Sequence, residues 1–220
     1  MIARIVPTLV MLVGLFAFRS SLADQYVIPS GSMEPTIQIG DHVLVDKRAY
    51  DLKIPFTDRS LFVTGSPRRG DVVVFCDPRN PSINLIKRLI GLPGDRIRVM
   101  DGLVSVNGVS LAVSSPPAGI QTRLHRSEAG VFSYLESGSG VRSHSVQRIP
   151  RMAVEADQEF AVPADHYFFL GDNRDNSADS RFWGFAPRDA LRGKAVGVLY
   201  SVRWPGPVPS VSFGRTGTAL

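Results

Sequence analysis

Short runs of Val, Ile, Leu and Phe recur along the body of the chain, separated by Gly, Pro and Asp. Apolar runs between turn-forming residues are typical of β-strands. Seven segments follow this pattern and are predicted to be strands: residues 42–45, 71–75, 83–90, 97–100, 103–106, 167–170 and 195–202. The dipeptides Asp101-Gly102 and Asn107-Gly108 have the composition of two-residue hairpin turns and separate alternating apolar positions. We therefore expect a mostly β protein with antiparallel pairing.

Between residues 110 and 154 this pattern gives way to Ser, Gly, Pro and Arg. Ser114-Ser115-Pro116-Pro117 and Ser137-Gly138-Ser139-Gly140 have the composition of loops. We interpret residues 110–154 as a variable β/loop region inserted into an antiparallel β core formed by residues 24–109 and 155–220. The segment from Trp204 to the C-terminus is rich in turn residues and is expected to be irregular.

The N-terminal segment, residues 1–23, is strongly apolar between Arg4 and Arg19. A helix over the 14 residues 5–18 spans about 21 Å, less than the roughly 30 Å hydrocarbon core of a bilayer. The segment therefore suits two roles: the apolar part of a signal peptide cleaved after Ala23, or one short transmembrane helix whose flanking arginines reach the interfaces. In both cases the positive N-terminus stays inside, which sends the body of the chain out of the cytosol.

Composition excludes several classes of protein. With 44% hydrophobic and 20% charged residues in 220, the chain is not generally disordered. The single cysteine, Cys76, excludes an internal disulfide and a cysteine-rich zinc site. The four histidines lie far apart in the sequence, so no metal site is expected. A net charge of +5 without a basic stripe gives no indication of nucleic-acid binding.

The first segment with candidate chemistry directly follows the apolar N-terminus. Ser30-Gly31-Ser32 lies between Pro29 and Pro35. The two prolines restrict the backbone on both sides of this segment, whereas Gly31 leaves it free to turn. An ordinary Ser/Gly linker is the alternative, but a linker gains nothing from the neighbouring apolar residues or from rigid prolines. A nucleophilic serine needs a base, and the chain contains neither a G-x-S-x-G nor a Ser-x-x-Lys motif.

One of the four lysines is a candidate base. Strand alternation places Lys87 on the same face as Leu85 and Leu89. At an ordinary pKa only about 0.04% of a lysine is neutral at pH 7, and burial lowers that pKa by about 3 to 5 units. The alternative is a strand lysine that extends outward beside Arg88.

A third segment, residues 169–181, is dense in Asp, Asn, Ser and Arg. It does not fit a calcium-binding EF-hand, because Ser180 and Ala186 stand where that loop requires Gly and Glu. Pairing of Asp179 with Arg181, or of Asp172 with Arg174, would fix the loop. Such a loop is either structural or holds a hydroxyl against a catalytic group.

The three segments form multi-residue motifs in a fixed order along the chain. They are Pro29-Ser30-Gly31-Ser32-Met33-x-Pro35-Thr36, Lys87-Arg88-x-x-Gly91-x-Pro93-Gly94-Asp95 and Gly171-Asp172-Asn173-Arg174-Asp175-Asn176-Ser177-x-Asp179-Ser180-Arg181. Together they resemble the motifs of bacterial type I signal peptidases, the leader peptidase family. The resemblance extends over most of residues 19–204, and it implies a β-rich catalytic core with an inserted variable region.

The resemblance also implies roles for individual residues. Ser32 resembles the nucleophile and Lys87 the general base of a Ser-Lys dyad, while Ser30 and the Ser32 backbone N–H resemble the oxyanion hole. Each of these assignments comes from the position of the residue in the motif.

Five further residues match the supporting and substrate-binding positions of the family. Ser177 resembles the serine that orients the lysine, and Asp179 and Arg181 match a supporting ion pair. Ile28 and Ile86 occupy positions that line shallow pockets for small residues at −1 and −3 of a signal peptide. The resemblance implies neither a cofactor nor a metal.

As a member of this family, the chain is expected to be a serine endopeptidase of the bacterial inner membrane. It would have one N-terminal span and an extracytoplasmic catalytic domain, with the lipid bilayer and the signal peptides of exported preproteins as its partners. Two departures stand out: many relatives have two spans, and some carry a disulfide that Cys76 alone cannot form. A processing enzyme dedicated to one secreted or pilus substrate, and an inactive relative that only binds, remain alternatives.

Overall fold

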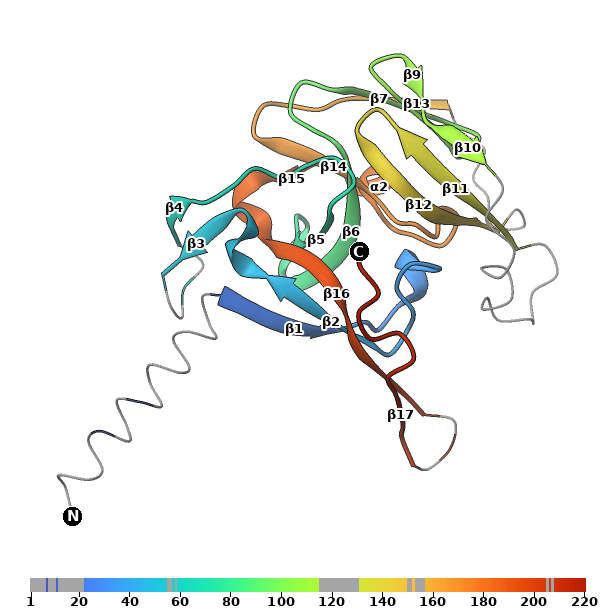
Figure 1. Cartoon of the computed structure of the whole chain (residues 1–220). Helices are drawn as coiled ribbons and strands as arrows, with labels where there is room; N and C mark the ends of the chain where they lie inside the picture. The colour runs from blue at the N-terminus through green and yellow to red at the C-terminus, as the bar shows by residue number, and fades with distance from the viewer. Residues whose placement is uncertain are drawn as a thin grey trace.

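In the computed structural model, the described residues are 22–54, 57, 59–114, 131–149, 152, 157–204, 206 and 208–220, together with Pro7 and Met11. Most of them lie in antiparallel β-strands (Figure 1). The largest sheet has eight strands in the order β1-β2-β16-β5-β6-β14-β15, with β17 paired to β16. Its strands are β1 (Ala23–Val27), β2 (Asp41–Asp46), β5 (Val72–Asp77), β6 (Asn80–Gly91), β14 (His166–Leu170), β15 (Ala186–Pro187), β16 (Leu191–Arg203) and β17 (Ser210–Ser212).

Three smaller sheets and four short helical segments complete the described fold. One sheet has the order β13-β7-β8-β9, one β10-β11-β12, and the third is the hairpin β3-β4. Their strands are β3 (Asp51–Lys53), β4 (Ser60–Val63), β7 (Arg96–Met100), β8 (Leu103–Val106), β9 (Val109–Ser110), β10 (Ala112–Ser114), β11 (Phe132–Gly138), β12 (Val141–Arg148) and β13 (Asp157–Ala161). The helical segments are η1 (Gly31–Met33), η2 (Lys47–Ala49), α2 (Ser180–Trp183) and η5 (Arg188–Ala190).

All seven predicted strands are confirmed, with ends shifted by at most four residues. Both predicted hairpin turns are also confirmed. The φ angles are 49° and 75° at Asp101 and Gly102, and 52° and 82° at Asn107 and Gly108. Positive φ at both central residues is the geometry whose twist matches the flanking strands, which explains the Asp-Gly and Asn-Gly pairs.

Two parts of the chain are more regular than the sequence predicts. Ser139 and Gly140, with φ of 49° and 84°, form the turn between β11 and β12 inside the region expected to be loop-like. The strand pattern is hidden there because β12 buries polar side chains, among them His144 and Gln147. The tail after Trp204 is not irregular throughout, because β17 pairs with β16. Residues 115–130 lie outside the described residues.

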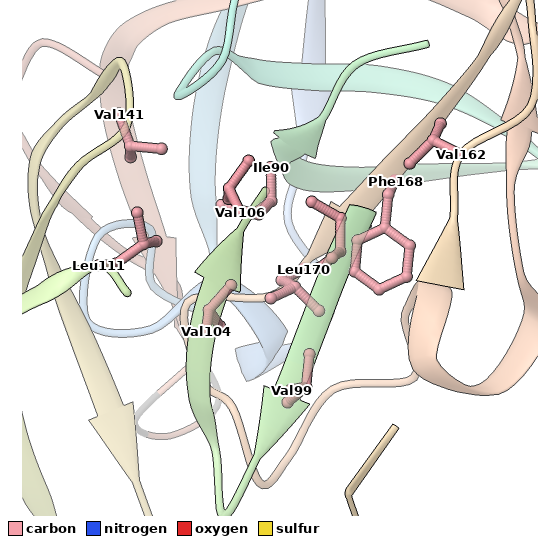
Figure 2. Packing of buried hydrophobic residues seen from close by; sticks show 10 residues of the cluster. Ile90, Val99, Val104, Val106, Leu111, Val141, Val162, Phe168 and Leu170 are labelled. Atoms are coloured by element: carbon pink, nitrogen blue, oxygen red, sulfur yellow. The ribbon is translucent and has the colours of Figure 1, made fainter. Parts of the chain in front are cut away.

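The core consists of three apolar clusters connected by β6. Ile90 belongs to the cluster between β6, β14 and the β7-β8 hairpin (Figure 2), Leu89 to a cluster with Phe75 and Phe169, and Ile86 packs against a third with Val43. The inner half of β6 is therefore buried on both faces, and each fully buried apolar side chain there stabilises the fold by about 1.5–3 kcal/mol. Lys87 lies in this half of the strand.

Within the described part of the chain, no helix has the length and hydrophobicity to cross a bilayer. The predicted membrane segment, residues 1–23, lies outside the described residues except for Pro7, Met11, Leu22 and Ala23. The strand β1 begins at Ala23, one residue before the predicted boundary.

Candidate active site

The short 3₁₀ turn η1 carries Ser32 between β1 and β2. Apolar residues on either side of Ser32 hold this turn: Ile28 and Met33 are both buried in the cluster beneath β2. The backbone of Ile28 also bonds to β2, because its N–H donates to Asp41 O over 2.9 Å. Ser32 is 8% exposed, so its hydroxyl is held at the edge of the core and still reaches the surface.

Lys87 lies directly beside Ser32. Its Nζ donates to Ser32 Oγ over 2.7 Å and to the carbonyl of Ile86 over 3.0 Å. The side chain is 4% exposed, and burial lowers the pKa of Lys87 to about 8, against the opposing effect of the Asp179, Asp172 and Asp77 carboxylates. The predicted burial of Lys87 is confirmed, and the alternative of an outward-facing lysine is wrong.

Asn173 clamps the backbone of the turn that carries Ser32. Its N–H donates to Ser32 O over 3.1 Å, and its side-chain Nδ2 donates to Gly31 O over 3.0 Å. Gly171 allows this approach, since a Cβ at that position would overlap both Ser32 O and Ser177 Oγ. The loop after β14 is thus fitted against η1 through backbone contacts.

The predicted Asp179–Arg181 contact is present. Arg181 donates from Nε and Nη2 to the two carboxylate oxygens of Asp179, each over 2.8 Å. Asp179 also accepts from the N–H of Gly171 over 3.0 Å and caps the start of α2. The ion pair therefore fixes Gly171, the residue against which the turn of Ser32 packs.

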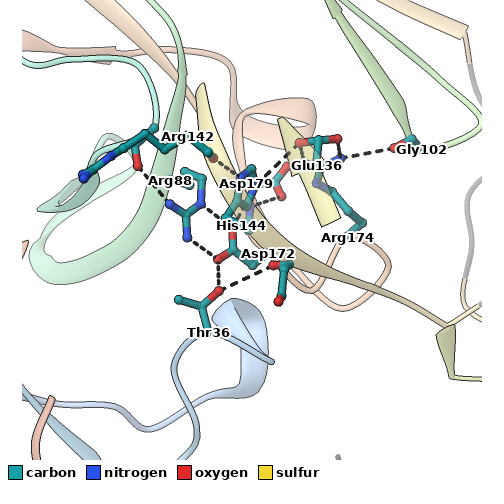
Figure 3. Close-up of polar contacts among 12 residues, drawn as sticks. Thr36, Arg88, Gly102, Glu136, Arg142, His144, Asp172, Arg174 and Asp179 are labelled. Atoms are coloured by element: carbon teal, nitrogen blue, oxygen red, sulfur yellow. Dashed lines mark hydrogen bonds and ion pairs between the residues drawn. The ribbon is translucent and has the colours of Figure 1, made fainter. Parts of the chain in front are cut away.

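The alternative Asp172–Arg174 pairing is wrong, because each residue has a different partner (Figure 3). Asp172 accepts from Arg88 Nε over 2.8 Å and Nη2 over 2.7 Å, and from Thr36 Oγ1 over 2.5 Å. Arg174 donates both terminal nitrogens to Glu136 on β11. Burial alone would raise the pKa of Asp172, but the Arg88 guanidinium outweighs it and holds the pKa below its ordinary value.

His144 of β12 fills the space between these two ion pairs. Its Nε2 lies 3.6 Å from Glu136 Oε2 and 3.9 Å from Asp172 Oδ1. Burial, with the nearby Arg88, lowers the pKa of His144 and favours the neutral ring. No group of three or more His, Cys, Asp or Glu side chains that could share a metal ion is found among the described residues.

The other predicted site residues lie around Ser32 with looser contacts. Ser177 is buried, and its Oγ has no hydrogen-bond partner among the described residues, so no bond joins it to Lys87. Ser30 is exposed and its side chain does not cap η1. Ile28 and Ile86 are brought together at the same apolar cluster.

Four residues of the site were given no role from the sequence. Thr36 and Asn173 stand inside the quoted motifs, which is the one signal that could have drawn attention to them. Glu136 and His144 lie in the region interpreted as variable, where no local pattern marks them. Their importance comes from contacts with residues 28 to 38 positions away along the chain.

A serine hydroxyl in contact with a buried lysine of lowered pKa has the composition of the class of serine hydrolases that use lysine where others use histidine. The comparisons with known proteins agree with this class. The family model described as signal peptidase, peptidase S26, matches residues 1–200. The chain therefore belongs to the signal peptidase family, whose members are serine endopeptidases that cleave signal peptides from exported preproteins.

Individual relatives of this chain are named signal peptidase I. Signal peptidase I of Pseudomonas aeruginosa is 38% identical over 216 residues, covering 90% of this chain and 72% of the relative. Signal peptidase I of Aquifex aeolicus is 33% identical, covering 95% of this chain and 86% of the relative. A crystal structure of a signal peptidase I from Enterococcus faecalis has 32% identity and covers 59% of this chain and 96% of that one, at a TM-score of 0.37, too low to carry an argument about the fold.

Proposed function

We propose that this protein removes signal peptides with Ser32 as nucleophile and Lys87 as general base. The observation that carries the proposal is the 2.7 Å contact between Lys87 Nζ, in the buried half of β6, and Ser32 Oγ in η1. A lysine with a pKa of about 8 is about 10% neutral at pH 7, roughly 250 times more than an ordinary lysine. Through the same contact, the neutral amine of Lys87 accepts the hydroxyl proton of Ser32.

The chemistry runs in two steps on this dyad. Ser32 Oγ attacks the carbonyl carbon of the scissile bond while Lys87 Nζ takes its proton. The protonated lysine then gives that proton to the departing amine. A water molecule activated by the neutral lysine hydrolyses the resulting ester and restores Ser32.

The supporting roles follow from the neighbours of the dyad. The Ser30 side chain and the Ser32 N–H are proposed to stabilise the oxyanion. Ser177 is proposed to orient the Lys87 amine, for which its buried hydroxyl has the free bonding capacity. The ion pair of Asp179 and Arg181 keeps the loop of Gly171 in place against η1, which supports a positioning role.

Small residues at −1 and −3 of the signal peptide are proposed to enter pockets beside Ile28 and Ile86. Ile28 belongs to the cluster of Val43 and Val74 and Ile86 packs against it, so the surface offered there is apolar and backed by a packed core. A large side chain would have to displace buried residues, which costs about 1–3 kcal/mol. The expected preference is Ala-x-Ala before the scissile bond.

We further propose that residues 1–23 anchor the protein as a single-pass protein of the bacterial inner membrane, with the catalytic part on the extracytoplasmic side. In this proposal residues 24–109 and 155–220 form the catalytic core, and residues 110–154 form an insertion. The apolar run between Arg4 and Arg19 and the positive N-terminus support this orientation. An anchor keeps the site at the lipid surface where signal peptides emerge, which raises its effective concentration.

The anchor proposal predicts how the protein fractionates. The full chain should stay in the membrane pellet after alkaline carbonate washing, because the apolar segment is held by lipid and not by charge. The same chain without residues 1–23 should be released. Release of the full chain under the same wash would contradict a spanning anchor.

The dyad proposal is tested by cleavage of several unrelated Ala-x-Ala precursors in detergent. Ser32→Ala and Lys87→Ala should both abolish cleavage, whereas Lys47→Ala, which removes a lysine of η2 outside the site, should not. The wild-type kcat/KM should rise with pH through a limb centred near 8, because the neutral amine of Lys87 in the free enzyme is the active form.

Each result has a distinct meaning. Activity that survives Lys87→Ala would overturn the lysine base. Cleavage of a single precursor would indicate a dedicated processing enzyme, and no cleavage of any precursor would indicate a binding protein.

A further inference from the structure

Arg148, the last residue of β12, has no part in the dyad, yet its side chain lies against the loop that holds the turn of Ser32. Its Nε donates to both carboxylate oxygens of Asp175, over 3.0 and 2.8 Å. Its Nη1 donates to Asp101 O at the tip of the β7-β8 hairpin, over 2.5 Å. The arginine therefore joins three elements: β12, this hairpin and the loop between β14 and α2.

The surrounding fold is shaped to accept the Arg148 side chain. A Cβ on Gly102 would overlap the Arg148 guanidinium, so the glycine of the hairpin turn makes room for it. The Asp175 carboxylate also accepts from the N–H of Ile149 over 2.7 Å. The side chains of Arg148 and Asp175 are 19% and 3% exposed. Desolvation offsets much of the attraction in such a pair, so its main effect is to fix the position of Asp175 relative to β12.

Asp175 ends a segment whose backbone is paired with β12. The N–H of Gln147 donates to Asp172 O over 2.8 Å, and the N–H of Arg174 donates to Gln147 O over 2.9 Å. Between these two bonds lies a parallel β-bridge from Gln147 to Asn173. The ion pair at Asp175 then fastens the C-terminal end of the same segment to β12.

The opposite side of this segment holds the turn of Ser32. Asn173 donates from its backbone N–H to Ser32 O and from Nδ2 to Gly31 O, over 3.1 and 3.0 Å. Asn173 therefore contacts β12 through the bridge and η1 through these two bonds. A shift of the segment would move both donors, and with them the hydroxyl of Ser32 that must stay in contact with Lys87.

We propose that Arg148 is a positioning residue for Ser32. Its ion pair with Asp175 fixes the segment that carries Asn173, and Asn173 fixes the backbone of the turn. The inference rests on the proposed function, because it concerns the placement of the proposed nucleophile. It gives the β10-β11-β12 sheet, which contains none of the catalytic residues expected from the sequence, a part in setting the rate of cleavage.

The test measures kcat and KM for cleavage of an Ala-x-Ala precursor. Arg148→Met removes the donors and should lower kcat about tenfold, because a small displacement of a nucleophile is costly. KM should stay within about twofold of the wild type, since the lost bonds act on the reacting group and not on substrate binding. Arg148→Lys, which can keep one bond to Asp175, should restore kcat to within about threefold of the wild type.

Arg98→Met is the matched control. Arg98 also donates to both oxygens of one carboxylate, that of Asp157, at an exposed site outside the loop. This variant should change neither kcat nor KM. Asp175→Asn keeps an acceptor for the Ile149 N–H and removes the charge that holds Arg148, so it should lower kcat even if Arg148→Met fails to fold. Urea unfolding of each variant identifies those that are folded under the assay conditions.

A double-variant cycle with Asn173→Ala distinguishes positioning from a general loss of structure. If Arg148 acts through Asn173, the combined loss in kcat is smaller than the product of the two single losses. Losses that multiply would overturn the inference, as would an unchanged kcat in folded Arg148→Met and Asp175→Asn, or a loss confined to KM. In each of these cases cleavage by the wild type leaves the proposed function intact. A wild type that cleaves no precursor would remove the proposed function, and this inference with it.

Discussion

At the scale of the residue, Lys87 shows the conflict between stability and activity at this site. Lys87 is 4% exposed, and burial is the main cause of its low pKa. The fold tolerates the free-energy cost of burying this charge because the surrounding part of β6 is packed on both faces. A neutral side chain of similar shape at position 87 would relieve the penalty, at the expense of the proposed base.

Lys87→Met is therefore expected to be inactive and more stable. A pKa of about 8 in the folded protein, against 10.5 as the ordinary value, corresponds to about 3 kcal/mol. The folded state releases its proton first, so the wild type gains stability as pH rises from about 8 to 10.5. Urea unfolding should show Lys87→Met more stable by up to about 3 kcal/mol at pH 7, with most of the difference gone above pH 10. A difference independent of pH would contradict the buried charge as its cause.

At the scale of the element, the site depends on two loops that are in close contact with each other. η1 presents Ser32, and the loop between β14 and α2 supplies Asn173 and the ion pair of Asp179 and Arg181. Gly171 is the point of closest approach between them. The sequence of this loop is polar because its contacts are hydrogen bonds to backbone groups of the neighbouring turn.

Gly171→Ala should separate the two loops. The added methyl group overlaps Ser32 O and Ser177 Oγ, so the turn must shift. We expect a loss of about 1–3 kcal/mol in unfolding free energy and a fall in kcat of about 100-fold, because small displacements of a nucleophile are costly. Gly108→Ala, in an open hairpin turn with φ of 82°, is the control: it should lower stability and leave kcat unchanged. Normal kcat in Gly171→Ala would show that the turn tolerates the shift.

At the scale of the whole molecule, a buried ion pair joins the β10-β11-β12 sheet to the loop between β14 and α2 (Figure 3). Arg174 and Glu136 are both almost fully buried, and Arg174 also donates to Gly102 O at the tip of the β7-β8 hairpin. The region interpreted as a variable insertion thus contributes a charged partner to the site. Removing one member of such a pair leaves an uncompensated charge in the interior.

Glu136→Gln should lower the unfolding free energy by about 3–5 kcal/mol, because Arg174 then lacks a buried counter-charge. Glu136→Met combined with Arg174→Met should recover most of this loss, since two apolar side chains replace the pair. Arg98→Gln, at the exposed pair of Arg98 with Asp157, is the matched control and should change stability far less. Chemical denaturation of the four proteins measures these differences, and a double variant no better than Glu136→Gln would contradict the argument.

The sequence by itself determined the seven strands whose apolar runs are local, and the hairpin turns at Asp101-Gly102 and Asn107-Gly108. On either side of Asp101-Gly102, every second residue is a β-branched apolar one (Ile97 and Val99, then Val104 and Val106), and this local pattern needs no information from elsewhere in the chain. Both members of the candidate dyad have a local signal: Ser32 stands in a turn between two prolines, and Lys87 is the one lysine within the segments predicted as strands. The motifs supplied their pairing, which spans 55 positions.

The tertiary structure alone decided which polar groups meet. Asp172 could pair with Arg174 by sequence distance, yet β6 brings Arg88 to Asp172 and β11 brings Glu136 to Arg174. Burial of His144 and Gln147 likewise made β12 unrecognisable from the sequence. A strand that buries polar residues lacks the alternation of apolar and polar positions by which strands are recognised. Such contacts join distant parts of the chain, and their energies depend on burial and geometry that no local pattern encodes.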